Sequence, residues 1–533
     1  MKRYARAKNG MVAAAHPLPA KAGRDVLKAG GNAVDAAIAA SLTLAVVAPA
    51  FSGLGGGGFM LIHQTKTGKS VALDYRETAP EAARADMYQI DKDGNVVNDA
   101  NSIGHLAIAV PGQVRGYAIA LERWGTMPIK SLAKSAVRYA SRGYPLSKTI
   151  GKIFRENRDH ARDKIQRFPA LGRVFGRGAV PRTGQRIRMA DLASSLGKFA
   201  VEGSDLFYSG PVARMIVTHI AQGGGILTLE DLAGYEARIR EPVVGDYRGF
   251  EIVSMPPPSS GGITLIEVLN ILETFRLSSF KHNAKDFIHI VAEAVKLGYA
   301  DRGRYIGDPD FVNVPTERLV TKGFAEARRK LISPYRVNLD VLPGVIDPYE
   351  GGSTTHFTVA DKDGNAVAAT ESIECCFGSG VMVPGAGIIM NDQMHDFDPV
   401  PGSINSIQAR KRPLSSMAPT IVLKDNRPLL CLGSAAGPRI ITAILQVLLN
   451  VLDFGMSVHE AVAAPRFHCQ GSALSLEGGV PAKTQAGLVE LGHVIERKRK
   501  LDLFFGGVQA IHIHKREMTG MADPRRDGTA MGI

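Results

Sequence analysis

A predicted β-hairpin near the middle of the chain carries side chains that could do chemistry. Residues 355–360 and the residues after Asn365 both show the alternation typical of strands, and the turn sequence DKDGN separates them. A glycine-containing loop between two such runs favours a hairpin. Thr354 directly precedes the first run, so the hairpin presents a hydroxyl group at its open end.

The register of this hairpin places polar groups beside Thr354. If Ala360 pairs with Ala366, counting back along both strands puts Ser372 directly opposite Thr354. Glu374 then shares the face of Ser372, because side chains alternate along a strand. Two hydroxyls and a carboxylate at one place permit nucleophilic catalysis, although the same residues also suit the polar face of an ordinary hairpin.

The sequence around Thr354 resembles the processing site of the γ-glutamyltransferase (γ-glutamyl transpeptidase) family. In that family the chain cuts itself before the first threonine of a TTH sequence, which here reads Thr354-Thr355-His356. The resemblance implies cleavage between Ser353 and Thr354. A threonine hydroxyl is a weak nucleophile, and the freed α-amine, with a pKa of about 8, would serve as its base. We therefore expect the uncut chain, in which this nitrogen is an amide, to be inactive.

The same resemblance implies a set of substrate-binding residues. In VALDYRETAP, Arg76 matches the family's arginine for the α-carboxylate of the glutamyl group, a contact that suits the guanidinium fork. In KRPLSSMAPTI, Ser415 and Ser416 match two serines that complete this carboxylate site. In GIIMNDQMHDF, Gln393 and Asp396 match residues that hold the α-amino group.

Three sites depart from the family pattern. Asparagine is expected where this chain has Glu374, which the resemblance also assigns to the α-amino group, and a carboxylate still accepts a hydrogen bond from an ammonium. Threonine is usual at Ser372, and serine keeps the hydroxyl. Two glycines usually supply the oxyanion donors ahead of a helix, here predicted over 440–452, and Ala436 and Gly437 stand in their place. Backbone donors survive this change unless the position needs a positive φ.

The fold implied by the resemblance is the N-terminal-nucleophile hydrolase fold, an α/β (α+β) four-layer αββα sandwich. Family-like phrases run from about Gly10 to Arg526, which is nearly the whole chain. Cleavage would give a large piece, residues 1–353, and a small piece, residues 354–533, which together form one αββα unit. The implied assembly is a heterodimer of these two fragments, and further dimerisation stays open.

Patterning predicts the elements that lead to the site. Two helices are predicted over 16–29 and 32–47, with Asn32 as the cap of the second. The glycine run 52–58 contains GxGxxG spacing, but it follows a helix and precedes a strand, the reverse of a dinucleotide site. We therefore predict tight backbone packing there rather than cofactor binding.

Further along, a strand is predicted over 250–254 and an amphipathic helix over 283–299. Asp301 and Arg302 read as turn residues that end this helix. His289 lies off the apolar stripe of the helix, so it is expected to be a solvated or capped histidine rather than a ligand.

The sequence gives no indication of a metal or organic cofactor. DKDGN occurs at 91–95 and at 361–365 but lacks the distal glutamate of a calcium loop, so both copies are predicted to be turns. His512 and His514 alternate as in a strand and have no third ligand nearby in sequence.

Composition fits a basic enzyme with a large core. The formal charge is +13 and hydrophobic residues make up 45%, but Lys and Arg are dispersed and no nucleic-acid motif accompanies them. We expect no nucleic-acid or membrane partner. The N-terminus lacks an apolar secretory segment, so the expected location is cytoplasmic. No CxxC or metal spacing joins the four cysteines, which predicts free thiols: Cys375, Cys376, Cys431 and Cys469.

The implied reaction is acyl transfer. Thr354 attacks the γ-carbonyl of a γ-glutamyl amide such as glutathione, and water, an amino acid or a peptide then takes the γ-glutamyl group. Within the same fold, the alternatives are an acylase for glutaryl-type (cephalosporin) side chains and a poly-γ-glutamate processing enzyme. Asp396 argues against the acylase, because a glutaryl donor lacks the α-amine. From another class, an uncut, noncatalytic binding protein is conceivable because of Glu374 and Ala436.

Overall fold

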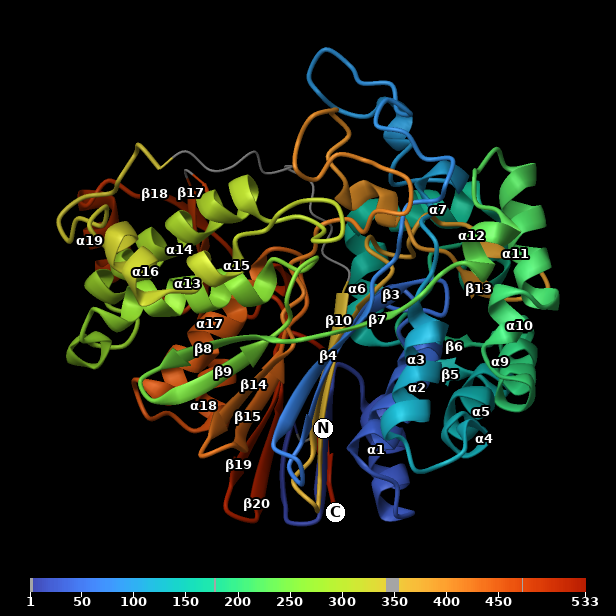
Figure 1. Cartoon of the computed structure of the whole chain (residues 1–533), viewed down its shortest axis with the longest axis horizontal. Coiled ribbons are helices and arrows are strands. Elements are labelled where there is room, and N and C mark those ends of the chain that lie inside the picture. The colour runs from blue at the N-terminus through green and yellow to red at the C-terminus, as the bar shows by residue number, and fades with distance from the viewer. Residues whose placement is uncertain (1–2, 177–178, 342–353, 472) are drawn as a thin grey trace.

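The computed structural model describes residues 3–176, 179–341, 354–471 and 473–533. Within these residues two seven-stranded sheets lie against each other, and helices cover the outer side of each (Figure 1). These are the four layers of the αββα sandwich that the resemblance predicts. Neighbouring strands are antiparallel in both large sheets.

The strand orders place distant segments side by side. The first sheet runs β1 (Tyr4–Ala7), β20 (Glu517–Ala522), β19 (Gln509–His514), β15 (Arg427–Gly433), β14 (Thr420–Lys424), β9 (Phe250–Ser254) and β8 (Val243–Tyr247). The second sheet runs β21 (Thr529–Gly532), β2 (Gly10–Ala14), β10 (Thr354–Asp361), β11 (Ala366–Ser372), β3 (Gly57–Gln64), β4 (Lys69–Tyr75) and β7 (Arg238–Arg240). Both sheets therefore combine strands from before and after Thr354.

Three smaller sheets lie outside this pair among the described residues. They are β5 (Tyr144–Pro145) with β6 (Arg186–Ile187), β12 (Met382–Val383) with β13 (Ile388–Ile389), and β16 (Phe467–Cys469), β17 (Ala473–Leu476) and β18 (Val494–Arg497).

One helical layer covers each large sheet (Figure 1). Beside the first sheet are α13 (Gly261–Glu273), α14 (Lys285–Tyr305), α15 (Thr316–Leu319), α16 (Lys322–Arg329), α17 (Arg439–Leu452), α18 (Val458–Ala463) and α19 (Ala482–Glu490). Beside the second sheet are α1 (Pro17–Lys28), α2 (Ala33–Val47), α3 (Gln113–Trp124), α4 (Ile129–Leu132), α5 (Lys134–Arg142), α6 (Lys148–Glu156), α7 (Ala161–Arg167), α8 (Pro169–Phe175), α9 (Ala190–Glu202), α10 (Asp205–Tyr208), α11 (Pro211–Gln222) and α12 (Leu229–Ala233).

Helix α2 is the buried support of the second sheet. Asn32 caps it as predicted, and Asn32 and Asp35 form a reciprocal capping box. Every residue of α2 is buried, which its small, alanine-rich side chains permit between the sheet and the outer helices.

The two faces of the β10–β11 hairpin meet different layers. Phe357 and Val359 pack into the core with α2, whereas Ala360 packs into the cluster between the sheets. Side chains alternate along a strand, so Thr354 also faces the space between the sheets. The hairpin thus directs its first hydroxyl away from the helical layer.

Two expectations about α14 are wrong. The helix continues to Tyr305, so Asp301 and Arg302 lie within its last two turns rather than in a turn. His289 is fully buried and hydrogen-bonds the ring of His493, with 2.8 Å between the nitrogens, and the carbonyl of Ser333. Residues distant in sequence cover the polar side of this helix, which its periodicity does not reveal.

The glycine and turn predictions are confirmed. A Cβ atom on Gly56 would lie 2.2 Å from the carbonyl oxygen of Ser372, so the glycine run allows close backbone contact with the hairpin. Both DKDGN segments form turns in which the first aspartate accepts from two backbone N–H groups: Asp91 from Asp93 and Asn95, and Asp361 from Asp363 and Asn365.

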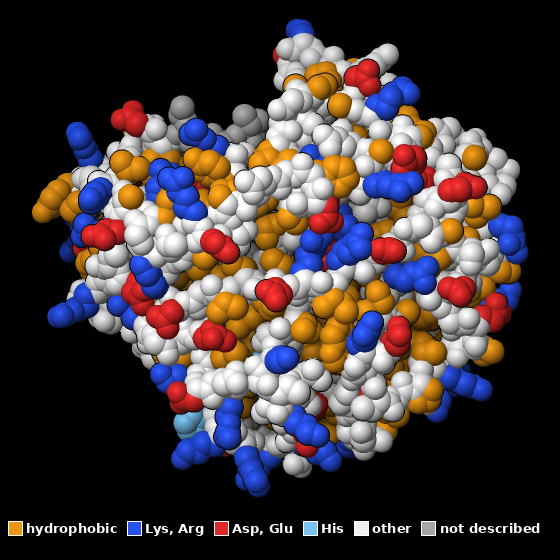
Figure 2. Space-filling model, viewed as in Figure 1, with side chains coloured by type: hydrophobic (Ala, Val, Ile, Leu, Met, Phe, Trp, Pro, Cys, Tyr) orange, Lys and Arg blue, Asp and Glu red, His pale blue; other side chains and the backbone are white. Residues whose placement is uncertain are grey.

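The four cysteines, all described, are buried free thiols as predicted. No helix in the described part of the chain combines the length and apolar composition that crossing a bilayer requires. Basic and acidic side chains are interspersed over the face seen in Figure 2, in agreement with the dispersed charge of the sequence.

Candidate active site

The predicted register of the hairpin is confirmed residue by residue. Ala360 pairs with Ala366, and Thr354 lies directly opposite Ser372. Both side chains are almost fully buried, with exposed fractions of 3% and 1%. The Thr354 carbonyl accepts a hydrogen bond of 3.1 Å from Arg526, near the C-terminus. The candidate nucleophile is therefore fixed by a strand partner and by a distant arginine.

Glu374 reaches the site by a bend rather than by strand alternation. Strand β11 ends at Ser372, and Glu374 has a φ of 71°. Its N–H donates to the Ser372 hydroxyl at 2.8 Å. Asparagine tolerates this left-handed conformation better than most residues, which gives a physical reason for the asparagine that the family pattern places here. Glu374 nevertheless lines the same small pocket as Thr354 and Ser372, as the sequence predicts.

Arg76 is a buried member of the site rather than a surface charge. It follows the end of β4 and is 1% exposed. Its guanidinium donates to the carboxylate of Asp396 and to the carbonyls of Pro413 and Leu414, at 3.3 and 3.1 Å for the carbonyls. Gln393 also donates to Asp396, and at 3.4 Å to Glu374. Glu77, the fully buried neighbour of Arg76, has a carboxyl oxygen 3.8 Å from the same guanidinium. The Arg76 guanidinium thus lies beside the hairpin together with the carboxyl groups of Asp396, Glu374 and Glu77.

The two predicted serines line the same pocket, directly after the two carbonyls to which Arg76 donates. Ser415 and Ser416 line it together with Arg76. The Ser416 hydroxyl accepts from Arg302 at 3.0 Å, and Arg302 also donates to Ser260 at 2.8 Å. Ser260 in turn donates to the Ser415 carbonyl at 2.6 Å. The serine loop is therefore held by α14 and by the segment before α13.

Sequence reasoning missed Arg302 and Arg526 as parts of this arrangement. The sequence predicts a turn at Arg302, but its guanidinium reaches from the last turns of α14 to the serine loop and donates to Ser416. Arg526 precedes β21, which β2 separates from β10 in the second sheet, and its guanidinium donates to the carbonyl of Thr354 at the start of β10. No local motif marks either residue.

The oxyanion position carries backbone strain. Ala436 has a φ of 120° and Gly437 a φ of 53°. The sequence predicts that the backbone donors survive the change from glycine to alanine unless the position needs a positive φ. Ala436 has such a φ, so its backbone is in a conformation that favours glycine and that a side chain makes strained. Gly437 lines the pocket of Thr354, just ahead of α17, whose first turn contributes a partial positive charge.

The other face of the hairpin carries a buried carboxylate. Glu371, opposite Thr355, accepts from Ser41 of α2 at 2.6 Å, from Ser52 at 3.2 Å and from Tyr75 at 3.3 Å. Burial raises the pKa of Glu371 to about 7, and these donors oppose the shift. The sequence contained no signal that this residue, next to Ser372, anchors the hairpin to α2.

His356 of the TTH motif is also buried. It shares the face of Thr354 and its Nδ1 lies 2.9 Å from the hydroxyl of Thr370. Burial lowers the pKa of His356 to about 3, so its imidazole is neutral at physiological pH. This histidine supports the hairpin as a neutral hydrogen-bonding group. Ser353, the predicted cleavage partner of Thr354, lies outside the described residues.

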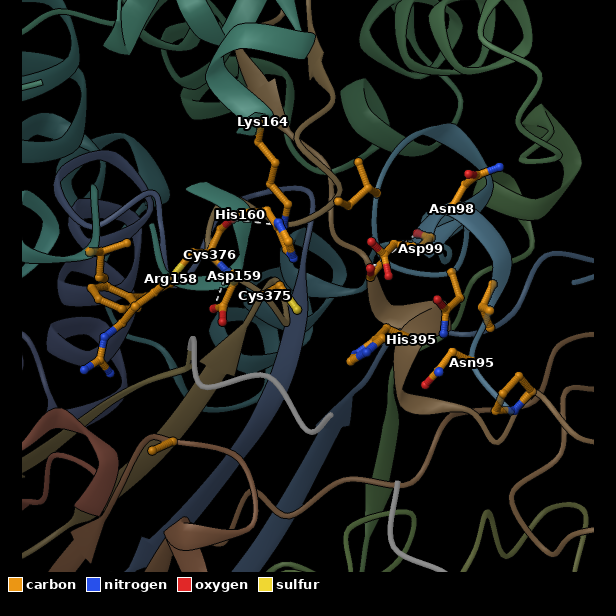
Figure 3. Close-up of a pocket in the computed structure, with 18 of the residues that line it drawn as sticks. Asn95, Asn98, Asp99, Arg158, Asp159, His160, Lys164, Cys375, Cys376 and His395 are labelled. Atoms are coloured by element: carbon orange, nitrogen blue, oxygen red, sulfur yellow. Dashed lines mark hydrogen bonds between the residues drawn. The ribbon is translucent and has the colours of Figure 1, made fainter. Parts of the chain in front are cut away.

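Two cavities of very different size are lined by neighbouring residues at the site. The small one, about 20 Å³, lies between Thr354, Arg76 and Ser416. The large one, about 1020 Å³, is lined by the loop 91–103, by α7 and by His395 (Figure 3). Residues adjacent in sequence line different cavities. Glu374 and Gly437 line the small cavity, whereas their neighbours Cys375 and Ala436 line the large one. A substrate could therefore span a tight pocket and a wide one.

Comparison with known proteins identifies the family of the chain. The family model described as Gamma-glutamyltranspeptidase matches residues 19–533. The chain is 40% identical to the glutathione hydrolase proenzyme of Escherichia coli (strain K12), over 98% of this chain and 91% of that protein. The solved gamma-glutamyltranspeptidase of Helicobacter pylori is 41% identical and aligns with a TM-score of 0.59, covering 63% of this chain and 96% of its own.

Acylases are similar to the chain as well. The Acylase ACY 1 proenzyme of Pseudomonas sp. (strain SE83) is 38% identical over 100% of this chain and 95% of that protein. The cephalosporin acylase of Bacillus halodurans is 31% identical and aligns with a TM-score of 0.89, over 100% of this chain and 97% of its own. Since the family model covers nearly the whole chain, the protein belongs to the gamma-glutamyltranspeptidase family.

Proposed function

We propose that this enzyme is a γ-glutamyltransferase and glutathione hydrolase that cuts itself between Ser353 and Thr354. The observation that carries the proposal is the ion pair between the buried Arg76 and the partly buried Asp396 in the pocket of Thr354 and Ser372. A proenzyme name on the Escherichia coli relative supports the cleavage, and its hydrolase name supports the reaction.

The ion pair is complementary to the α-amino acid end of a γ-glutamyl group. The α-carboxylate would accept hydrogen bonds from the guanidinium of Arg76 and from the serine loop. The α-ammonium would donate hydrogen bonds to Asp396, to Glu374 and to the side-chain carbonyl of Gln393. The Oε1 atom of Gln393 has no hydrogen-bond partner among the described residues, so it is available to an ammonium donor. Because the small cavity holds only about 20 Å³, Arg76 and Asp396 must separate to admit the donor.

When the donor binds, Arg76 and Asp396 each exchange one charged partner for another. Arg76 loses Asp396 and gains a carboxylate, and Asp396 loses Arg76 and gains an ammonium. A buried charge left unpaired would be costly, so a donor that lacks either group binds poorly. This exchange selects a γ-glutamyl group over a simple acyl group.

The chemistry proceeds through a covalent intermediate. The Thr354 hydroxyl attacks the γ-carbonyl while its α-amine accepts the proton, and the amide N–H groups of Ala436 and Gly437 stabilise the oxyanion. The ammonium formed at Thr354 then protonates the leaving amine, which departs into the large cavity as the C–N bond breaks. Water or an amine attacks the resulting ester by the reverse sequence and frees Thr354.

Glutaryl-type acylase activity is the second candidate, favoured by the overall similarity to the two acylases. Glu374 and Asp396 oppose it. A glutaryl side chain has no ammonium, so two carboxylates would face an apolar methylene. The volume of the large cavity also suits a poly-γ-glutamate acceptor, which a panel of acceptors distinguishes.

A donor panel tests the assignment. Purified protein is assayed with γ-glutamyl and glutaryl anilides, which differ only in the α-amino group. We expect the γ-glutamyl anilide to be preferred. Asp396→Asn should lower that preference by roughly thirtyfold, since a charged hydrogen bond contributes about 2 kcal/mol. A preference for the glutaryl anilide in the parent enzyme would favour the acylase instead.

The matched control removes a negative charge from the same loop but from a residue outside the small pocket. Asp398→Asn changes a carboxylate two residues away, outside the small pocket. It should leave the ratio of the two activities as it is in the parent. If Asp396→Asn and Asp398→Asn change the ratio equally, Asp396 does not recognise the α-amine.

A further inference from the structure

Three potential metal ligands lie close together, one lining the small pocket and two lining the large cavity. Glu374, Cys375 and His395 each offer one ligand atom, and these atoms lie within 4.8 Å of one another. The side chains come from two segments, the bend after β11 and the 3-10 turn Gln393–Asp396. Figure 3 shows the thiol of Cys375 and the ring of His395 directed toward each other in the large cavity.

One of the three carries an unsatisfied polar atom. His395 is only 6% exposed, and its Nδ1 has no hydrogen-bond partner among the described residues. Buried polar atoms without partners are uncommon and point to a role other than packing. Cys375 is also buried, with an exposed fraction of 7%.

The surrounding charges leave the cluster suited to a divalent cation. Lys164 lies 3.9 Å from a carboxylate oxygen of Asp392, whose other oxygen accepts from the Cys375 N–H at 2.9 Å. These two opposite charges offset each other. Asp396 is likewise paired with Arg76. The Glu374 carboxylate and a Cys375 thiolate would then contribute two negative charges to the bound ion.

We propose that Glu374, Cys375 and His395 bind a divalent cation of the zinc class, and that the bound ion inhibits the enzyme. Sulfur, nitrogen and carboxylate oxygen are the donor types that zinc takes in proteins. As the metal–sulfur bond forms, the thiol proton passes to solvent. The large cavity gives the ion a route to the site and supplies a water as the fourth ligand.

Inhibition follows from the place of Glu374, and this step rests on the proposed function. Glu374 is assigned to the α-ammonium of the donor, and a metal on its carboxylate would repel that ammonium. The ion and the γ-glutamyl donor therefore exclude each other. Zinc should raise the KM for the donor more than it lowers kcat.

Binding is tested first, without reference to activity. Metal-free processed enzyme is titrated with Co²⁺, whose bond to a thiolate gives a charge-transfer band in the near ultraviolet. The parent enzyme should show this band with one equivalent of cobalt, and excess Zn²⁺ should remove it. Cys375→Ser should abolish the band, and His395→Gln should weaken cobalt binding by at least about tenfold.

Matched controls line the same cavity without belonging to the cluster. Cys376→Ser and His160→Gln remove a thiol and an imidazole that also face the large cavity. Both should bind cobalt as the parent does. Thermal melts confirm that all four variants are folded. If His395→Gln and Cys375→Ser retain the parent's cobalt affinity, or the band is absent from a folded parent, the proposal is wrong.

Inhibition is then measured with a γ-glutamyl anilide, which lacks the thiol by which glutathione would itself bind zinc. We expect Zn²⁺ to inhibit the parent competitively and to inhibit His395→Gln at least about tenfold less strongly. Equal inhibition of parent and variant would overturn the inhibitory role. If the parent hydrolyses no γ-glutamyl donor, the proposed function fails, and the cobalt titration still decides the metal site.

Discussion

Ala436 occupies a backbone conformation that an L-residue adopts at a cost. With a φ of 120°, its backbone is in a strained conformation for a residue that has a Cβ atom. Each residue in such a conformation costs about 1–3 kcal/mol of folding free energy. The residue adjoins Gly437 at the site where the oxyanion is expected. Strain at one residue therefore bears directly on the geometry of catalysis.

Replacing this residue with glycine should stabilise the protein. We expect Ala436→Gly to raise the free energy of unfolding by about 1 kcal/mol, because the relief of strain exceeds the entropic cost of glycine. The measurement is denaturant unfolding of the uncut Thr354→Ala protein. Ala435→Gly, whose φ is not positive, is the control and should be destabilising by about 0.5–1 kcal/mol. Equal destabilisation by both changes would show that Ala436 is unstrained.

The β10–β11 hairpin joins chemistry on one face to anchorage on the other. Thr354 and Ser372 point between the sheets, and Glu371 points toward α2, where Ser41 and Ser52 donate to it. A pleated strand gives this division automatically, since neighbours in sequence face opposite sides. The position of the nucleophile thus depends on a buried carboxylate that does not contact it.

The hairpin's anchor should make stability depend on pH. Burial raises the pKa of Glu371 from 4.5 to about 7, so the folded protein holds this proton more tightly than the unfolded chain. The stabilisation of the folded protein by the protonated Glu371 is complete below about pH 4.5 and is lost as the pH rises through about 7. Its upper size is about 3 kcal/mol.

Glu371→Gln is the test, again in the uncut Thr354→Ala protein. The glutamine side chain of this variant cannot ionise. As the pH rises from 5 to 8, the free energy of unfolding should therefore fall less for the variant than for the parent. Parallel curves for Glu371→Gln and its parent would contradict the role given to this carboxylate.

Local pattern was sufficient to predict the hairpin and its register. Strand alternation and the DKDGN turn together place Thr354 opposite Ser372, and the structure agrees. The helices over 16–29 and 32–47 also follow from caps and breaks, and their observed ends differ from the predicted ones by at most one residue. The pocket residues came from resemblance of short phrases, and the structure gathers them in one place.

Long-range contacts and backbone angles could not be predicted in this way. Arg302 contacts Ser416 across 114 positions and Arg526 contacts Thr354 across 172, and neither pairing has a local signature. The positive φ of Ala436 was not visible because its residue type argues against it. His289 is buried by His493, which comes from a different segment.

At the scale of the whole molecule, the two fragments expected from cleavage are interleaved. In the second sheet β10 pairs with β2 and β11 with β3, so strands after Thr354 lie between strands before it. The first sheet is similar, because β1 pairs with β20 and β9 with β14. Separating the fragments would break both sheets and expose both hydrophobic cores.

The fragments should therefore stay together after cleavage. We expect the cut protein to elute from a sizing column under native conditions as one species containing both fragments. They should separate only at denaturant concentrations that also abolish its secondary structure. Dissociation in native buffer, with loss of activity, would contradict the interleaved arrangement.

The central claim is that Thr354 becomes the nucleophile by cleavage of its own chain. Intact mass after purification and prolonged incubation, for the parent and for Thr354→Ala, tests this most directly. The parent should give two fragments, residues 1–353 and 354–533, and activity should rise with their appearance, while Thr354→Ala stays whole and inactive. A parent chain that stays whole yet hydrolyses the γ-glutamyl anilide, or a Thr354→Ala protein that is cut and active, would contradict the mechanism.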